Sequence, residues 1–281
     1  MITALHTWSF RDVVKNDRSF NIFKMLDTAA SLGFRGIEIL TGMANCPPAD
    51  IGSEEVAHLE KVLQHAESVG VRVLCFSTYN DFAYVKDEAW RQMNIAYIKK
   101  WLELSGKVGV PNIRMLTGYY NDLADRKHLE KLTEDGMREC VPLAEKFNVN
   151  MAVENHNTIF FSAEELLALA DRLDSKRITF CPDPSNWCPK FFDADCPDAE
   201  REKVYRSVEL LAPRATQSHL KLKGVDGETL RGFDLGRLLA IYKKAGYKGG
   251  VTFESIVDGD LVAPLQKARE VFDAARRKAG V

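Results

Sequence analysis

The chain has 281 residues, of which 46% are hydrophobic and 28% are charged, and its formal net charge is −2. This composition is typical of a globular protein with a sizeable core, and it lacks the excess of basic residues that marks nucleic-acid binding. No run of about 18 apolar residues suits a membrane helix, and residues 1–10 do not resemble a signal peptide. We therefore expect a cytoplasmic protein whose six cysteines, none in a C-x-x-C pair, are reduced thiols.

A repeated pattern runs through the chain, in which a helical segment ends near a glycine and a short β-branched run follows at once. Apolar residues recur at three- and four-residue steps between these runs, for example in residues 166–173, as expected for amphipathic helices. Ser162 and Asp234 precede such segments and are suitable N-caps. The predicted strands are, in chain order, residues 2–10, 36–40, 71–77, 112–117, 149–155, 177–183, 215–222 and 249–255.

Alternating strands and helices predict a parallel sheet with right-handed crossovers. Eight such units favour an α/β fold that closes into a single (β/α)8 TIM barrel spanning residues 1–281. The alternative is an open doubly wound sheet, but its nucleotide-binding G-x-G-x-x-G pattern does not follow the first strand. No low-complexity linker divides the chain, which also favours one domain.

Active sites of such barrels lie at the carboxyl ends of the strands. Glu154, Asp183, His219 and Glu254 each follow an apolar run on four successive predicted strands. Three carboxylates brought that close would repel one another strongly unless a cation lay between them. Oxygen ligands with a single imidazole suit one divalent ion, with Mn²⁺ or Mg²⁺ favoured and Co²⁺ or Zn²⁺ possible.

Other polar or aromatic residues near these strand ends are candidates to contact a substrate. His156 and Lys221 lie two residues beyond Glu154 and His219 and should face the same side of their strands. Lys221 could stabilise a developing oxyanion, whereas Trp8 or Glu38 could equally be ordinary core residues. The full candidate set is His6, Trp8, Glu38, His156, Asn186 and Lys221. Phe191 and Phe192, in the loop of residues 187–197, could cover a substrate or pack on a partner subunit.

Taken together, these segments resemble the xylose-isomerase-like TIM barrels of the sugar phosphate isomerase/epimerase family, which includes tagatose epimerase, inosose dehydratase and hydroxypyruvate isomerase. The resemblance covers essentially the whole chain, and the order and spacing of the motifs carry it. They are Gly36-Ile37-Glu38, Val153-Glu154-Asn155-His156, Asp183-x-x-Asn186, His219-x-Lys221 and Gly246-Tyr247-x-Gly249 leading to Glu254.

The resemblance implies that Glu154, Asp183, His219 and Glu254 are metal ligands, and that Glu154 and Glu254 are also the acid/base pair. The implied reaction is isomerisation or epimerisation of a small sugar, polyol ketone or other hydroxy-carbonyl compound through a metal-bound enediolate. A homodimer or homotetramer is also implied. Asn186, Lys221 and Lys223 stand where the epimerase subgroup carries a histidine and an arginine, which argues against a tagatose-type epimerase.

Three alternatives remain open. A lyase of the inosose or dehydroshikimate dehydratase type, or one that cleaves oxidised glycosides, would use the same enediolate and then expel a substituent. An endonuclease of abasic DNA shares the barrel, but it generally needs several metals and a basic surface, and this chain has six histidines and a negative formal charge. A non-catalytic binding subunit would hold no stoichiometric metal.

Overall fold

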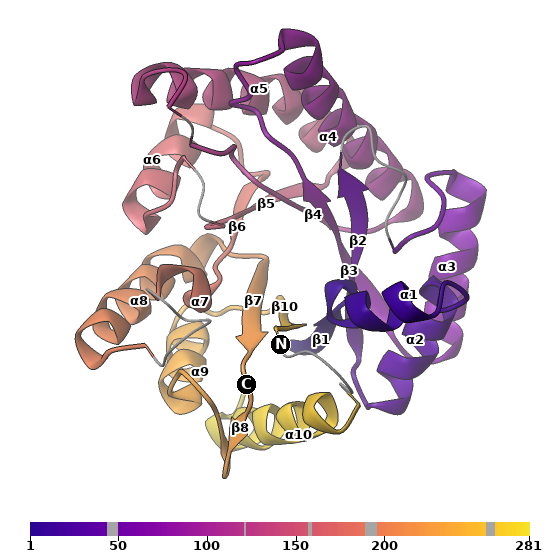
Figure 1. The fold of residues 1–281 in the computed structure, drawn as a ribbon. Coiled ribbons are helices and arrows are strands. Elements are labelled where there is room, and N and C mark those ends of the chain that lie inside the picture. The colour runs from indigo at the N-terminus through magenta and orange to yellow at the C-terminus, as the bar shows by residue number, and fades with distance from the viewer. Residues whose placement is uncertain (44–49, 121, 157–158, 189–195, 257–261) are drawn as a thin grey trace.

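The protein was analysed as a computed structural model that describes all residues except 44–49, 121, 157–158, 189–195 and 257–261. Its main sheet has eight parallel strands in the order β6-β5-β4-β3-β2-β1-β10-β7, and they curve into a barrel that Figure 1 shows end-on. The strands are β1 (Ile2–His6), β2 (Gly36–Met43), β3 (Arg72–Tyr79), β4 (Asn112–Met115), β5 (Asn150–Glu154), β6 (Ile178–Cys181), β7 (Gln217–Leu222) and β10 (Gly250–Ser255). The expected TIM-barrel fold is confirmed.

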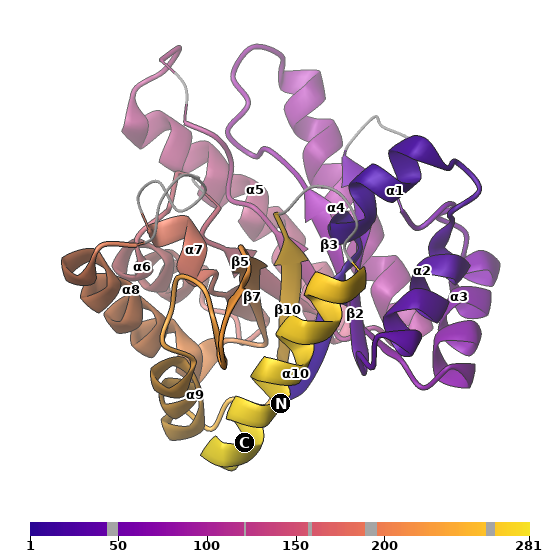
Figure 2. The ribbon, with the colours of Figure 1, turned by 60° about the horizontal axis from the view of Figure 1, so that its bottom comes forward.

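Helices surround the strands and form the outer wall of the barrel (Figures 1 and 2). They are α1 (Arg11–Asn16), α2 (Ile22–Ser31), α3 (Val56–Ser68), α4 (Glu88–Val108), α5 (Arg126–Phe147), α6 (Ala163–Leu173), α7 (Pro184–Trp187), α8 (Asp198–Leu211), α9 (Leu235–Lys244) and α10 (Val262–Ala279). Short 3-10 turns, η1 (Thr7–Phe10) and η2 (Ala212–Arg214), follow β1 and α8. No helix in the described ranges is long and apolar enough to cross a membrane.

Local sequence signals set many of the helix boundaries. The Ser162 hydroxyl accepts a hydrogen bond from the Glu165 amide, and the Ser162 amide donates one to the Glu165 carboxylate, which forms a capping box at the start of α6. Asp234 caps α9 by accepting from the Arg237 amide. At the end of α4, Gly109 takes a left-handed conformation with φ of 77°, which costs glycine little. These caps supply partners for helix-end groups that otherwise have none.

The barrel closes between β6 and β7 through a seam of few backbone contacts. Phe180 bridges Ala215, and the amides of Thr216 and His219 donate to the carbonyls of Phe180 and Pro182 at 3.1 Å. The other neighbouring strands pair as ladders, for example β7 with β10 from Gln217 to Leu222, although the β2–β3 ladder has two register shifts. The seam therefore completes the cylinder with weaker pairing than elsewhere in the sheet.

Each of the eight predicted strands has its observed counterpart, with two local differences. The first strand ends at His6 and not at residue 10, because the His6 ring nitrogen Nδ1 accepts a hydrogen bond from the Trp8 amide at 3.0 Å and the chain turns into η1. Strand alternation therefore does not place Trp8. A small antiparallel hairpin, β8 (Val225–Asp226) with β9 (Thr229–Leu230), was not expected.

Small residues make room at the amino ends of the strands. A methyl group added to Gly36 would lie 2.6 Å from Cδ1 of Leu74, and one added to Gly250 would lie 2.7 Å from the same atom. Leu74 itself is 5% exposed. Two glycines thus allow one leucine to fill this end of the barrel.

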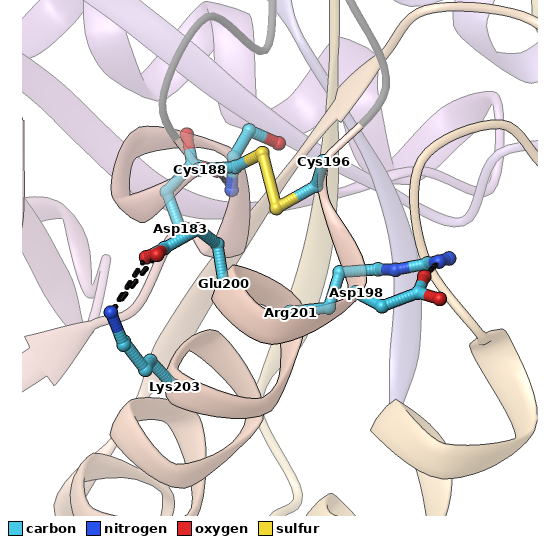
Figure 3. Close-up of a disulfide and its surroundings, with 8 residues drawn as sticks. Asp183, Cys188, Cys196, Asp198, Glu200, Arg201 and Lys203 are labelled. Atoms are coloured by element: carbon cyan, nitrogen blue, oxygen red, sulfur yellow. Dashed lines mark hydrogen bonds and ion pairs between the residues drawn. A yellow bond between two sulfur atoms is a disulfide. The ribbon is translucent and has the colours of Figure 1, made fainter.

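The expectation of six reduced cysteines is wrong for one pair. Cys188 and Cys196 form a disulfide that joins the end of α7 to the chain entering α8, near the Asp198–Arg201 pair (Figure 3). Cys75, Cys140 and Cys181 are buried free thiols, and Cys46 lies outside the described residues. The eight-residue separation gave no C-x-x-C signal, and only the fold brings the two sulfurs together. Disulfides are rare in the reducing cytosol, so this pair does not support the cytoplasmic expectation.

Candidate active site

Four successive strands bring the predicted metal ligands to one end of the barrel. Glu154 ends β5, Asp183 follows β6, His219 lies in β7 and Glu254 lies in β10. None of the four is more than 6% exposed. Burying this many carboxylates requires compensating partners, because isolated buried charges are very costly.

His219 has one satisfied and one free ring nitrogen. Its Nε2 lies 3.0 Å from Oε1 of Glu38, whereas Nδ1 has no hydrogen-bond partner among the described residues and lies 3.6 Å from Oε2 of Glu154. A carboxylate behind an imidazole is the usual way to orient a metal-binding histidine. Glu38 thus fixes the ring with Nδ1 directed at the candidate ligands.

Three of the predicted ligands fit a single divalent ion. One ligand atom each from Glu154, Asp183 and His219 lie within 4.8 Å of one another, and the unpartnered His219 Nδ1 lies 3.6 Å from Oε2 of Glu154. Two carboxylates with one imidazole form a donor set suited to a hard or borderline divalent ion. Glu254 lies outside this compact group, although it is buried beside it.

Two buried cations already accompany the carboxylates. Arg114, in β4, pairs with Oε2 of Glu154 and donates to the Thr78 carbonyl at 2.8 Å. Lys221, in β7, pairs with Oδ2 of Asp183, and its Nζ lies 3.5 Å from Glu254. We refer to Glu38, Arg114, Glu154, Asp183, His219, Lys221 and Glu254 as the buried charged cluster.

Two asparagines hold the cluster together. Asn186 donates to Glu154 at 2.9 Å and accepts from Lys221 at 2.8 Å, so one amide bridges an anion and a cation. Asn155 exchanges two hydrogen bonds with the backbone of Asp183, at 2.8 and 2.9 Å. The Asp183 side chain also caps α7 by accepting from the Ser185 amide at 2.9 Å.

The cluster shifts the acidity of its members. Burial opposes ionisation of Glu154, but Arg114 and His219 outweigh it and hold the pKa of Glu154 well below its usual range. Burial likewise opposes ionisation of Glu254, and Lys221 and His6 lower its pKa. Both carboxylates are therefore ionised at neutral pH.

The other predicted contact residues lie around this cluster in different settings. His6 is buried, and its Nε2 lies 3.8 Å from Glu38, while Trp8 is 40% exposed beside Arg11. His156 is partly buried, its ring packs edge-on against Tyr79 at 5.9 Å, and its Nδ1 has no hydrogen-bond partner in the described part of the chain. Phe191 and Phe192 lie outside the described residues. Substrate contact by these residues stays a prediction.

Sequence reasoning missed Arg114. It is 2% exposed and lies between Ile113 and Met115, so a charged residue inside an apolar strand was the available signal. Its guanidinium also lies 4.7 Å from the ring centroid of Tyr79, which is the geometry of a cation–π contact.

Comparison of the sequence with known protein families identifies the family of this chain. The family described as "Xylose isomerase-like TIM barrel" matches residues 26–278. The chain belongs to this family. The resemblance found in the sequence is thereby confirmed.

Relatives of this chain include named sugar epimerases. It is 24% identical over 247 residues to the Haemophilus influenzae protein named "Putative L-ribulose-5-phosphate 3-epimerase SgbU", with 82% of each chain covered. Among solved structures, a D-psicose 3-epimerase is 15% identical with a TM-score of 0.76, and each chain is covered completely. The Escherichia coli 3-keto-D-glucoside 4-epimerase is 16% identical with a TM-score of 0.69, covering 92% of this chain and 94% of the other. At these identities the solved structures support the fold alone.

Proposed function

We propose that this protein is an isomerase-class enzyme that epimerises or isomerises a small sugar or related hydroxy-carbonyl compound by proton transfer at carbon. The observation that carries the proposal is the pair of buried, ionised carboxylates, Glu154 and Glu254, beside an imidazole with a free nitrogen. The naming of the family relatives as epimerases favours this reaction over the lyase alternative.

A divalent ion, with Mn²⁺ or Mg²⁺ favoured, would be held by Glu154, Asp183 and His219, and Glu254 is proposed as a fourth ligand. When bound, such an ion acts as a Lewis acid that makes the carbon–hydrogen bond beside a carbonyl more acidic. Glu38 would keep the His219 ring oriented, and Asn186 would hold Glu154 in place.

Ionised carboxylates begin the reaction as proton acceptors. Glu254 is the most exposed of the four predicted ligands, at 6%, so we propose it as the first base. Return of that proton by Glu254 to the neighbouring carbon gives an aldose–ketose isomer. Return to the opposite face, which gives an epimer, requires Glu154 to carry a proton instead. Arg114 opposes that protonation, because it stabilises the Glu154 carboxylate.

Candidate substrate contacts are Trp8, which is partly exposed, and His156, whose Nδ1 is free to bond. An aromatic wall and a few polar groups are the usual lining of a small-molecule site. Lys221 and Asn186 replace the residues of the epimerase subgroup, so we expect a substrate other than tagatose.

The test combines metal content with hydrogen exchange at carbon. The wild type should carry about one divalent ion per chain, and it should exchange the α-proton of at least one ketose with solvent deuterium. A Glu154→Gln, Glu254→Gln double variant should lose both properties, whereas Glu209→Gln on the exposed face of α8 should keep them. Turnover in the double variant would overturn the proposal. A product lighter by water or an aglycone would favour the lyase.

A further inference from the structure

Lys221 lies where the proposed function, on which this inference rests, requires a divalent ion. Its Nζ pairs with Asp183 and lies 3.5 Å from Oε2 of Glu254 and 3.9 Å from Oε1 of Glu154. These three carboxylates come from three different strand ends, and all are proposed ligands. The residue is only 5% exposed, so the ammonium group is enclosed among them.

The Lys221 ammonium group is bonded to the Asp183 oxygen that does not cap α7. Asp183 Oδ1 accepts from the Ser185 amide at 2.9 Å, and this bond caps α7. The other oxygen, Oδ2, accepts from Lys221. An ion that binds Oδ2 would lie close to the Lys221 ammonium, and repulsion between the two positive charges makes them compete for this oxygen.

Of the two cations in the cluster, Lys221 has the side chain better suited to change position. The Arg114 guanidinium is fixed by Glu154, by the Thr78 carbonyl at 2.8 Å and by the face of Tyr79. Lysine has a compact charge on a flexible stem with rotatable donors. Lys221 also has a second acceptor in Asn186, at 2.8 Å, to which it can stay bonded after leaving Asp183.

We propose that Lys221 is the internal counter-ion of the metal-free enzyme and competes with the divalent ion for Asp183. It keeps the carboxylates of Asp183, Glu154 and Glu254 together before an ion binds. The free energy needed to displace Lys221 lowers the affinity of the site for the ion. Lys221 thus sets both the stability of the metal-stripped protein and its affinity for metal.

The decisive variant is Lys221→Met, which keeps an unbranched side chain one atom shorter than lysine and removes the charge. Titration of EDTA-stripped protein with Mn²⁺ by calorimetry should give a Kd at least about tenfold lower than that of the wild type. The stripped variant should also melt at a lower temperature, and saturating Mn²⁺ should raise its Tm by more than it raises that of the wild type.

Lys244→Met is the matched control, because Lys244 is an exposed lysine on α9 that pairs with Glu209. It removes the same charge far from the cluster and should change neither the Kd nor the Tm increase. Should Lys221→Met fail to fold even with Mn²⁺ present, Lys221→Gln replaces it, since the amide can still donate to Asp183 and Asn186. The same direction of change in Kd is expected.

An unchanged or weaker affinity for Mn²⁺ in the Lys221 variant, with normal binding by the wild type, would overturn the competition and leave the proposed function intact. If neither wild type nor variant bound Mn²⁺, Co²⁺ or Zn²⁺, the competition and the metal-dependent part of the proposed function would both fail. Tighter binding together with a lower Tm of the stripped variant supports both halves of the inference.

Discussion

The two ends of the same barrel are built on different physical principles. At the carboxyl ends of the strands, the buried charged cluster keeps four acids, an arginine and a lysine together by pairing and hydrogen bonding. At the amino ends, Leu74 packs into the space left by Gly36 and Gly250. Removing one partner from a buried ion pair costs more than most changes in apolar packing. The charged end is therefore the part of the barrel most easily damaged by a single substitution.

The largest effect should come from Glu254→Gln at the charged end. Loss of a proton-transfer group typically lowers turnover by about 10²- to 10⁴-fold. We expect a fall in kcat of that order on a ketose that the wild type converts. Glu209→Gln serves as the control. A variant that kept more than about a tenth of wild-type kcat would exclude Glu254 as a base.

Next in size is the effect of Arg114→Met on stability. It leaves the carboxylate of Glu154 buried without its cation, and breaking such a pair costs about 3–5 kcal/mol. Urea unfolding of EDTA-treated protein should show this loss. The double variant Arg114→Met, Glu154→Gln should recover a large part of it. A loss below about 1 kcal/mol in the single variant would mean that Arg114 does not balance this charge.

A smaller loss is expected at the opposite end from Gly36→Ala. The added methyl group would meet Leu74 at 2.6 Å, Ala4 at 2.9 Å and Ile2 at 3.0 Å. Overpacking of this kind costs about 1–3 kcal/mol. The affinity for Mn²⁺ should not change, because the cluster lies at the other end. In the control Gly236→Ala, in α9, the nearest atom to the added methyl group is Oδ1 of Asp234 at 3.2 Å, so a smaller loss is expected. Equal losses in both variants would contradict the packing explanation.

The smallest effect is a gain in stability from Asp50→Asn. Asp50 follows β2 without an ion-pair partner among the described residues, and burial raises its pKa to about 6 from an ordinary 3.8. The folded state thus holds this proton more tightly than the unfolded state, and stability falls as pH rises from about 4 to 6. We expect the variant to be more stable by about 1–2 kcal/mol at pH 7, because Asp50 is only half-buried, and unchanged at pH 3.5. Equal gains in stability at both pH values would contradict the explanation that ionisation of Asp50 destabilises the folded state.

The barrel was predictable because its signals are local. Helical segments that end in glycine or a similar residue precede seven of the eight strands, and the polar residues that close strands five to eight were readable as a group. Arg114 was missed because a polar residue at the middle of a strand gives no indication of the carboxylate it faces. The pairing of Lys221 with Asp183 and the disulfide at Cys188 depend on how distant segments meet, which single-strand patterns do not contain. The roles of His6, Trp8 and His156 stay predictions.

The seam between β6 and β7 divides the candidate ligands, since Asp183 follows one of its strands and His219 lies in the other. Thermal breathing of the sheet should begin where backbone pairing is sparsest. The amides of Thr216 and His219, which donate across the seam, would then exchange with deuterated solvent faster than those within β10. An ion bound by residues from both β6 and β7 would link the two strands, and it should slow hydrogen exchange at those two amides selectively.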